Sequence, residues 1–196
     1  MNAKLKLSML LLIYSLSLSC SSSSNDTMKS SATTLLHAEN GIYTDVSQAH
    51  LPLHDLENSS MDSKPADIDN DGDIDIVIAS EFSENILLIN DGNGYFSDVT
   101  SDRFPKDEWW AMDGDFFDFD RDNDLDILFA NVHGGNFQVY LNDGKGYFTN
   151  QTSSFFSTAL IADGFDMETA DFNGDNITDF FLSNYAGSDF LFFAKQ

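Results

Sequence analysis

The 196-residue sequence predicts an all-β protein built from three repeated units, each with four short strands and one Asp-rich loop. The Asp-rich segments DIDNDGDID (67–75), DFDRDNDLD (118–126) and DFNGDNITD (171–179) begin 51 and 53 residues apart. In addition, INDGNGYFSDVT (89–100) matches LNDGKGYFTNQT (141–152) at an offset of 52 residues. Self-similarity at a nearly fixed period is the signature of a repeat architecture.

Hydrophobic patterning predicts the strands within each unit. An alternating strand such as 95–100 comes first, and a variable connector and a short strand then lead into the Asp loop. A nearly continuous apolar strand such as 76–79 follows the loop, and a third apolar strand such as 86–89 follows that. In the first two units the third strand ends in Asn-Asp-Gly-X-Gly, a turn sequence whose glycines supply positive φ. Strands that are apolar on both faces need cover on both sides, which stacked sheets provide.

The match between GIYTDVS (41–47) and GYFSDVT (94–100) places the units at 41–93, 94–145 and 146–196. A repeat of about fifty residues with four strands is typical of a β-propeller blade, and propellers usually have about four to eight blades. We therefore expect three blades to form an incomplete ring, or a ring completed by oligomerisation. Two copies would together form a homodimeric ring of six blades. The alternative is that this sequence is a truncated gene product.

The Asp-rich loops have the spacing expected of calcium sites. Side chains at positions 1, 3 and 5 converge inside a tight loop, position 7 can offer its backbone carbonyl, and a carboxylate at position 9 closes the cage. All-oxygen ligands in this number favour Ca²⁺. Position 6 requires positive φ, which glycine and asparagine tolerate, and it is occupied by Gly72, Asn123 and Asn176. An EF-hand is excluded because its Glu at position 12 is replaced by Ile78, Phe129 and Leu182.

These loops resemble those of the FG-GAP/VCBS repeat family, whose calcium-loop blades also occur in integrin α-subunit propellers, and the resemblance covers 41–196. It implies three ligand sets. The sets are Asp67, Asp69, Asp71 and Asp75 with the carbonyl of Asp73; Asp118, Asp120, Asp122 and Asp126 with the carbonyl of Asp124; and Asp171, Asn173, Asp175 and Asp179 with the carbonyl of Ile177. The third set has one carboxylate fewer, so we expect the weakest binding there. The family uses such ions as structural staples, and calcium-regulated binding is the alternative.

A further acidic position recurs outside the loops. Asp62, Asp113 and Asp166 each lie five residues before a loop begins. We expect these side chains to accept backbone hydrogen bonds at a strand entry, and direct metal ligation is the alternative.

The charge of the chain excludes several partners. It has 9 Lys and Arg against 33 Asp and Glu, for a formal net charge of −24. This charge repels nucleic-acid phosphates and anionic lipid surfaces. Hydrophobic residues make up 42% of the chain, too many for a disordered acidic tail. The bias toward 27 Asp over 6 Glu indicates turns and sites for hard cations.

The N-terminal residues 1–20 have the pattern of an export signal. Lys4 and Lys6 precede an apolar run at 7–18, which is too short to span a bilayer and is followed by the sole cysteine, Cys20. The ending LSLSC resembles the lipobox of bacterial lipoproteins, which implies lipidation of Cys20, and an ordinary secretory signal is the alternative. The Ser/Thr-rich residues 21–40 are expected to be a flexible linker. The protein is therefore expected at the bacterial outer membrane or cell surface, in the periplasm, or secreted, with a lipid anchor as its only membrane attachment.

Trp109 and Trp110 have no counterparts in the other two units. An exposed aromatic pair could stack on a sugar or anchor a protein partner, whereas buried indoles would fill a gap between blades.

Nucleophile, phosphate-loop and zinc motifs are absent from the sequence, so no catalytic residue is assigned. We expect a module that binds an extracellular protein or glycan. The alternatives are a catalytic or non-catalytic fragment of a secreted polysaccharide-acting enzyme, and a structural spacer.

Overall fold

The computed structural model describes residues 35–38, 41–52, 59–106, 110–132, 137–156, 163–185 and 187–195. It divides into two compact units, Met1–Asp45 and Val46–Gln196. None of the helices found in these described ranges is both long and apolar enough to cross a membrane. The expected signal at 1–20 and Cys20 lie outside the described residues.

Over its described residues, the first unit contains one antiparallel strand pair. β1 (Leu35–Ala38) pairs with β2 (Gly41–Thr44). The segment 21–40, expected to be a linker, therefore contains a strand near its C-terminal end. Tyr43 lies opposite Leu36 in the register and is 68% exposed.

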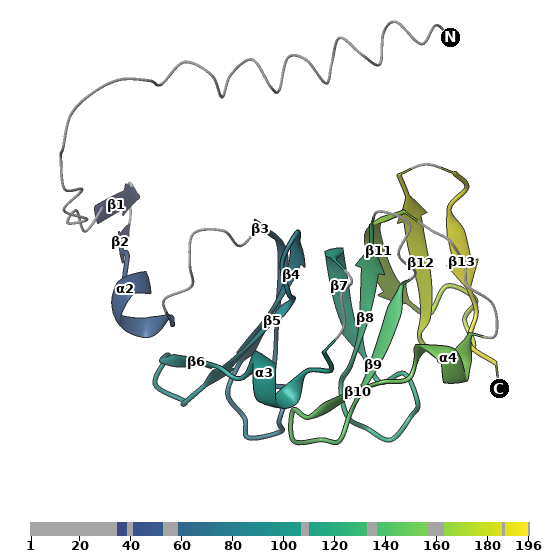
Figure 1. Ribbon diagram of the computed structural model, residues 1–196, viewed down its shortest axis with the longest axis horizontal. Helices are drawn as coiled ribbons and strands as arrows, with labels where there is room; N and C mark the ends of the chain where they lie inside the picture. The colour runs from purple at the N-terminus through teal and green to yellow at the C-terminus, as the bar shows by residue number, and fades with distance from the viewer. Residues whose placement is uncertain are drawn as a thin grey trace, which may run out of the picture. The chain divides into compact units, whose positions relative to one another are not determined.

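Over its described residues, the second unit contains three antiparallel sheets that stand side by side in chain order (Figure 1). The first sheet consists of β3 (Ser59–Ala66), β4 (Asp75–Glu81), β5 (Ile86–Asn90) and β6 (Phe96–Asp98). The second consists of β7 (Ala111–Phe117), β8 (Asp126–Asn131), β9 (Gln138–Asn142) and β10 (Phe148–Asn150). The third has three strands over the described residues: β11 (Gly164–Ala170), β12 (Asp179–Asn184) and β13 (Phe190–Phe192). The all-β class with four-stranded sheets is confirmed, and the part of the chain described here does not close into a ring.

The sheets are shifted by one strand relative to the sequence repeats. β6 lies in the repeat 94–145 but pairs with β5 of the preceding repeat, and β10 pairs with β9 in the same way. The cause is the Asn-Asp-Gly-X-Gly turn, which joins each third strand to the strand that follows it. Across these turns the N–H of Asp91 donates to the carbonyl of Tyr95 at 3.0 Å, and that of Asp143 to Tyr147 at 3.1 Å. The second and third repeats therefore each begin with the outer strand of the sheet before them.

The hydrophobic core lies between the sheets, as predicted from the strands that are apolar on both faces. All six residues of β8 are buried. One cluster joins the first sheet to the second: Ile68, Val77, Ala79, Leu87, Phe104, Ala111, Ile127, Phe129, Tyr140 and Phe148. The other joins the second sheet to the third: Phe117, Leu128, Ala130, Phe137, Val139, Met167, Phe180 and Leu182.

Single-turn helices follow the outer-strand segments and connect successive sheets. They are α2 (Ser47–His50), α3 (Thr100–Arg103) and α4 (Thr152–Phe155). After α3, the buried ring of Phe104 packs edge-on against three aromatic rings of the second sheet, those of Phe129, Tyr140 and Phe148. The Thr100 hydroxyl accepts a hydrogen bond from the backbone N–H of Leu87 at 2.9 Å, which ties the start of α3 to β5.

Candidate metal centre

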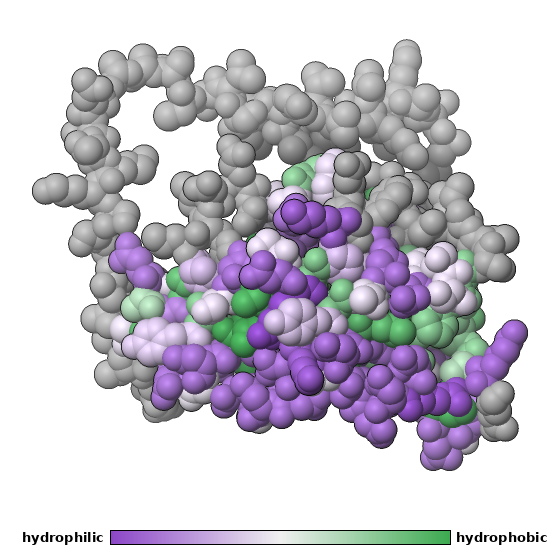
Figure 2. All heavy atoms as spheres, turned by 60° about the horizontal axis from the view of Figure 1, so that its bottom comes forward, coloured by the Kyte–Doolittle hydropathy of each residue, from purple (hydrophilic) through white to green (hydrophobic). Residues whose placement is uncertain are grey.

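The three Asp loops occupy the same position in each sheet, between its first and second strands. These connections lie at the lower end of the sheets in Figure 1. When that end is turned forward in Figure 2, hydrophilic residues cover most of it. The repeats therefore gather their acidic loops on one end of the second unit.

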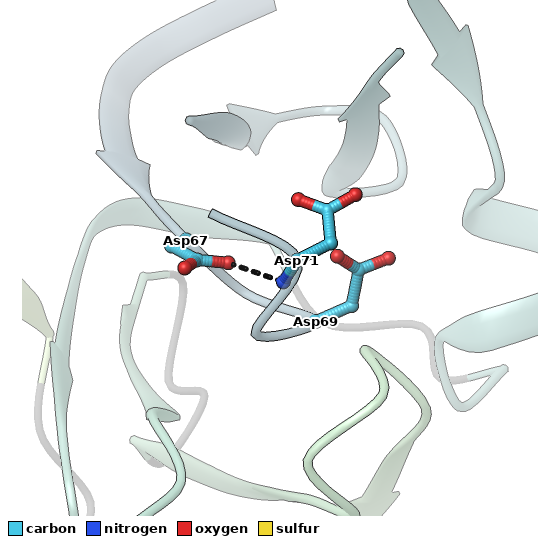
Figure 3. Close-up of side chains that lie close together, drawn as sticks. All are labelled: Asp67, Asp69 and Asp71. Carbon is cyan, nitrogen blue, oxygen red and sulfur yellow. Dashed lines mark hydrogen bonds between the residues drawn. The ribbon is translucent and has the colours of Figure 1, made fainter. Parts of the chain in front are cut away.

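The first loop is held by hydrogen bonds from its own backbone to its first aspartate. The Asp67 carboxylate accepts the N–H groups of Asp71 and Gly72, each at 3.1 Å, and Asp71 accepts the N–H of Asp73 at 2.9 Å. Figure 3 shows the resulting turn, with the side chains of Asp67, Asp69 and Asp71 close together. The backbone closure thus brings positions 1, 3 and 5 to one point.

The other two loops repeat this pattern. The carboxylates of Asp118 and Asp171 accept the N–H groups four and five residues later, at 2.8–3.1 Å. Position 6 has positive φ in all three loops, as predicted: 93° at Gly72, 77° at Asn123 and 64° at Asn176.

Position 4 also has positive φ, which the sequence analysis missed. The values are 60° at Asn70, 70° at Arg121 and 80° at Gly174. Asn70 uses this conformation to reach the neighbouring sheet, where its amide donates to Asp124 Oδ1 at 3.1 Å and to the carbonyl of Gly144 at 3.3 Å. Asn70 and Gly174 at position 4 were the available signal, because asparagine and glycine tolerate this backbone region.

The first loop has the donor set of a cation site. Carboxylate oxygens of Asp67, Asp69 and Asp71 lie within 4.8 Å of one another. The Asp69 Oδ1 atom is buried and has no hydrogen-bond partner, while its Oδ2 atom accepts from Arg103 Nη1 at 3.1 Å. A buried carboxylate oxygen without a donor is costly unless a cation lies nearby. These residues therefore fit a hard metal ion such as Ca²⁺.

The second loop forms a similar cluster from Asp118, Asp120 and Asp126, whose ligand oxygens also lie within 4.8 Å of one another. Burial, followed by the charges of Asp122 and Asp118, raises the pKa of Asp120. A bound cation would relieve this repulsion between carboxylates. The two Asp-rich clusters could therefore each bind a metal ion.

The third loop differs at position 3, where Asn173 replaces an aspartate. Within 163–185, no third cluster of three acidic or histidine ligands meets the same distance limit. Asn173 can still supply a neutral oxygen, but at present its Oδ1 atom accepts the N–H of Asp175 at 2.9 Å. The weaker third site remains a prediction.

The aspartate at position 9 has a second task in every loop. Asp75, Asp126 and Asp179 are at most 1% exposed. In each of them, Oδ2 accepts a hydrogen bond from the backbone N–H of the second loop residue. The Oδ1 atom accepts a hydrogen bond from a backbone N–H in the third strand or just after it. The distances range from 2.8 to 3.0 Å. Position 9 therefore anchors the loop to the sheet, and of the three only Asp126 also belongs to a described metal cluster. Its role as a ligand remains a prediction.

The side chains at position 7 pack against the neighbouring turn. A Cβ atom at Gly92 would lie 2.5 Å from an Asp73 oxygen, and one at Gly144 would lie 2.4 Å from an Asp124 oxygen. Gly92 and Gly144 also have positive φ, of 79° and 74°. The positive φ therefore favours glycine in the Asn-Asp-Gly-X-Gly turn, and a Cβ atom there would also displace the position 7 carboxylate. The predicted ligation by the position 7 carbonyls, including that of Ile177, remains untested.

The recurring aspartates before the loops follow a β-bulge in each first strand. The register shifts lie at Ser60/Asp62, Ala111/Asp113 and Gly164/Asp166. Asp113 Oδ2 accepts the N–H of Met167 in the third sheet at 2.8 Å, so this residue has the predicted role as a backbone acceptor. Its Oδ1 atom lies 3.4 Å from Lys64 Nζ in the first sheet. Burial, reinforced by a hydrogen bond to Asp62, raises the pKa of Asp113 to about 7.

Aromatic side chains gather at the other end of the sheets. Trp110 is 37% exposed and packs edge-on against Phe82 with ring centroids 5.3 Å apart. A nearby hollow of about 350 Å³ is lined by Glu81, Met112, Val132, Asp163, Phe165 and Tyr185. Trp110 therefore has a partly covered ring with an accessible remainder. Trp109 lies outside the described residues.

Comparison with known proteins supports the repeat assignment. The family described as FG-GAP-like repeat matches the chain twice, at 67–129 and 118–182. Each match starts at an Asp loop and ends in the apolar strand after the next one, so it spans one full period. No curated protein matches the chain. Because the two matches together cover more than half of its 196 residues, the chain belongs to the FG-GAP-like repeat family.

Proposed function

We propose that this protein is an exported, calcium-stapled FG-GAP repeat module that binds an extracellular partner, with glycans as the ligand class favoured by its aromatic end. The proposal of export and lipid anchoring rests on the signal-like residues 1–20 and on Cys20. Calcium is supported by the oxygen-only loops and by the unpartnered, buried Asp69 Oδ1. In this proposal the ions hold the loop end, and the opposite end binds the ligand.

The observation that carries the binding proposal is the 350 Å³ hollow lined by the exposed rings of Phe165 and Tyr185, with Phe82 and Trp110 at the same end of the sheets. Phe82, Phe165 and Tyr185 are 57%, 52% and 79% exposed. Phe165 and Tyr185 stack with centroids 6.2 Å apart. Flat rings offer surfaces for the apolar face of a sugar, and the carboxylates of Glu81 and Asp163 in the lining can accept bonds from its hydroxyls.

The test is binding of the full chain to a panel of immobilised glycans in the presence of calcium. Phe165→Ala and Tyr185→Ala should each weaken binding about tenfold or more, because each removes ring surface from the lining of the hollow. Tyr147→Ala is the matched control, since Tyr147 is 49% exposed and lies outside this hollow. Equal losses in all three variants, or no glycan bound, would overturn the glycan proposal. Release of shortened sugars would instead favour a polysaccharide-acting enzyme fragment.

A further inference from the structure

The third sheet differs from the other two at its outer edge. In the first two sheets the third strand pairs with an outer strand, β6 or β10. Among the described residues, no strand pairs with the outer edge of β13. Leu191 in β13 is 50% exposed, whereas Leu87 and Val139 at the same register position are fully buried. The third sheet therefore has a site for one further strand.

A hollow of about 610 Å³ lies where the outer strand and its turn are found in the second sheet. Half of its lining residues are phenylalanines, among them Phe119, Phe156 and Phe193, and charged residues of the second Asp loop line the rest together with the segment after β13. In the second sheet, Phe148 of the outer strand packs against Phe104 at 5.1 Å and is buried. Phe156 has the same position after α4 as Phe104 has after α3. A ring on an added strand would fill this hollow in the way that Phe148 fills its own.

We infer that the outer edge of β13 binds the segment Gly41–Ser47 of a second copy of this chain. The sequence GIYTDVS matches GYFSDVT (94–100), which contains β6, and in this alignment Tyr43 takes the position of Phe96 and Phe148. Tyr43 is 68% exposed. β2 pairs on one edge with β1, and over the described residues its other edge pairs with no strand.

The helical turn after this segment has the same local structure as its counterparts. The residue before the helix has φ and ψ of −110° and 5° at Val46, −116° and 13° at Val99, and −119° and 14° at Gln151. The N–H groups three and four residues after Val46 donate to its carbonyl, as they do after Val99. Segment 41–50 therefore has the sequence and the local backbone of an outer strand followed by its helical turn.

α2 also contacts the first sheet as α3 contacts the second. His50 stacks on Tyr95 with ring centroids 4.2 Å apart, and Arg103 lies over the equivalent Tyr147 at 5.0 Å. The strand before α3 is β6, which belongs to the preceding sheet. By the same rule, the strand before α2 belongs to a sheet that precedes the first one. The third sheet of a second copy can supply that sheet, and two reciprocal contacts would give six blades, within the usual range.

Cysteine cross-linking tests the pairing and its register. In the second sheet, Thr149 pairs with Leu141, and the equivalent pair between copies is Thr44 with Phe193. Opposed residues of neighbouring strands are close enough for a disulfide. We would mix full chains with Cys20→Ser that carry either Thr44→Cys or Phe193→Cys, distinguished by tags of different size. The expected result is a disulfide-linked heterodimer, and Tyr185→Cys in place of Phe193→Cys should give none.

Light scattering of the wild-type full chain provides the second measurement. We expect a mass of twice the chain mass of 21.8 kDa. Tyr43→Ser should weaken dimerisation about 10- to 100-fold, because it removes the ring that fills the hollow. Tyr185→Ser, at another exposed tyrosine, should leave dimerisation unchanged. A monomeric mass without the heterodimer would overturn the inference.

Discussion

Replacing Asp126 with alanine tests whether position 9 anchors the loop independently of metal. Its side chain accepts the N–H of Phe119 at 2.8 Å and that of Asn142 at 2.9 Å, and the residue is 1% exposed. Each buried N–H left without a partner costs about 1–3 kcal/mol. We therefore expect Asp126→Ala to lower the free energy of unfolding by about 3–5 kcal/mol, even in excess chelator. Asp126→Asn keeps one acceptor oxygen and should cost less.

Urea unfolding at pH 7 is the assay, with Asp122→Asn as the control in the same loop. Asp122 is exposed and its Oδ1 atom accepts the N–H of Asp124 at 3.0 Å, a bond that asparagine can keep. In chelator this variant should stay within about 0.5 kcal/mol of wild type, because it removes a charge from an exposed acidic loop. In calcium, the free energy of unfolding of Asp122→Asn should fall below that of wild type, because the variant lacks one carboxylate ligand. A loss below about 1 kcal/mol for Asp126→Ala in chelator would refute the anchoring argument.

Two further predictions concern contacts between the sheets. Asn142→Ala should lower the free energy of unfolding by about 2–4 kcal/mol in urea, because its amide donates to the carbonyls of Ile68 at 2.8 Å and Leu125 at 3.1 Å. Asn90→Ala should cost less, since the Asn90 amide makes one exposed bond, at 3.0 Å, and an equal loss would contradict this. Asp113 has a folded-state pKa of about 7, above its ordinary value of 3.8, so its contribution to stability falls as pH rises from about 4 to 7. Asp113→Asn should remove this pH dependence from urea titrations and should be more stable than wild type at pH 8, whereas parallel pH profiles would contradict the assignment.

The local features of the loops could be predicted from the sequence because they recur. Three copies of one spacing identified the turns, and positive φ at Gly72, Asn123 and Asn176 followed from the tightness of the loop. Arg121 at φ 70° could not be predicted, because its conformation is accompanied by a long-range bond from its guanidinium to the carbonyl of Lys195 at 2.8 Å. A side chain of that type gives no local signal of a left-handed backbone.

The double role of position 9 required the structure, whereas the pairing of the outer strands did not. The Asn-Asp-Gly-X-Gly turn predicted a hairpin after the third strand, and β6 pairs with β5 across that turn. By contrast, an aspartate that binds metal and one that binds backbone N–H groups look alike in a sequence. Only the burial of Asp75 and Asp179 and their paired N–H donors distinguish the anchoring role.

Calcium titration by calorimetry most directly tests the central claim, that the repeated Asp loops are metal sites. We expect binding of up to three ions per chain, with the loop at 171–179 the weakest because Asn173 replaces a carboxylate. Asp69→Asn should remove or strongly weaken one of the tighter sites and leave the second loop's binding unchanged. No binding heat up to millimolar calcium, with an unfolding midpoint that is the same in calcium and chelator, would contradict the account.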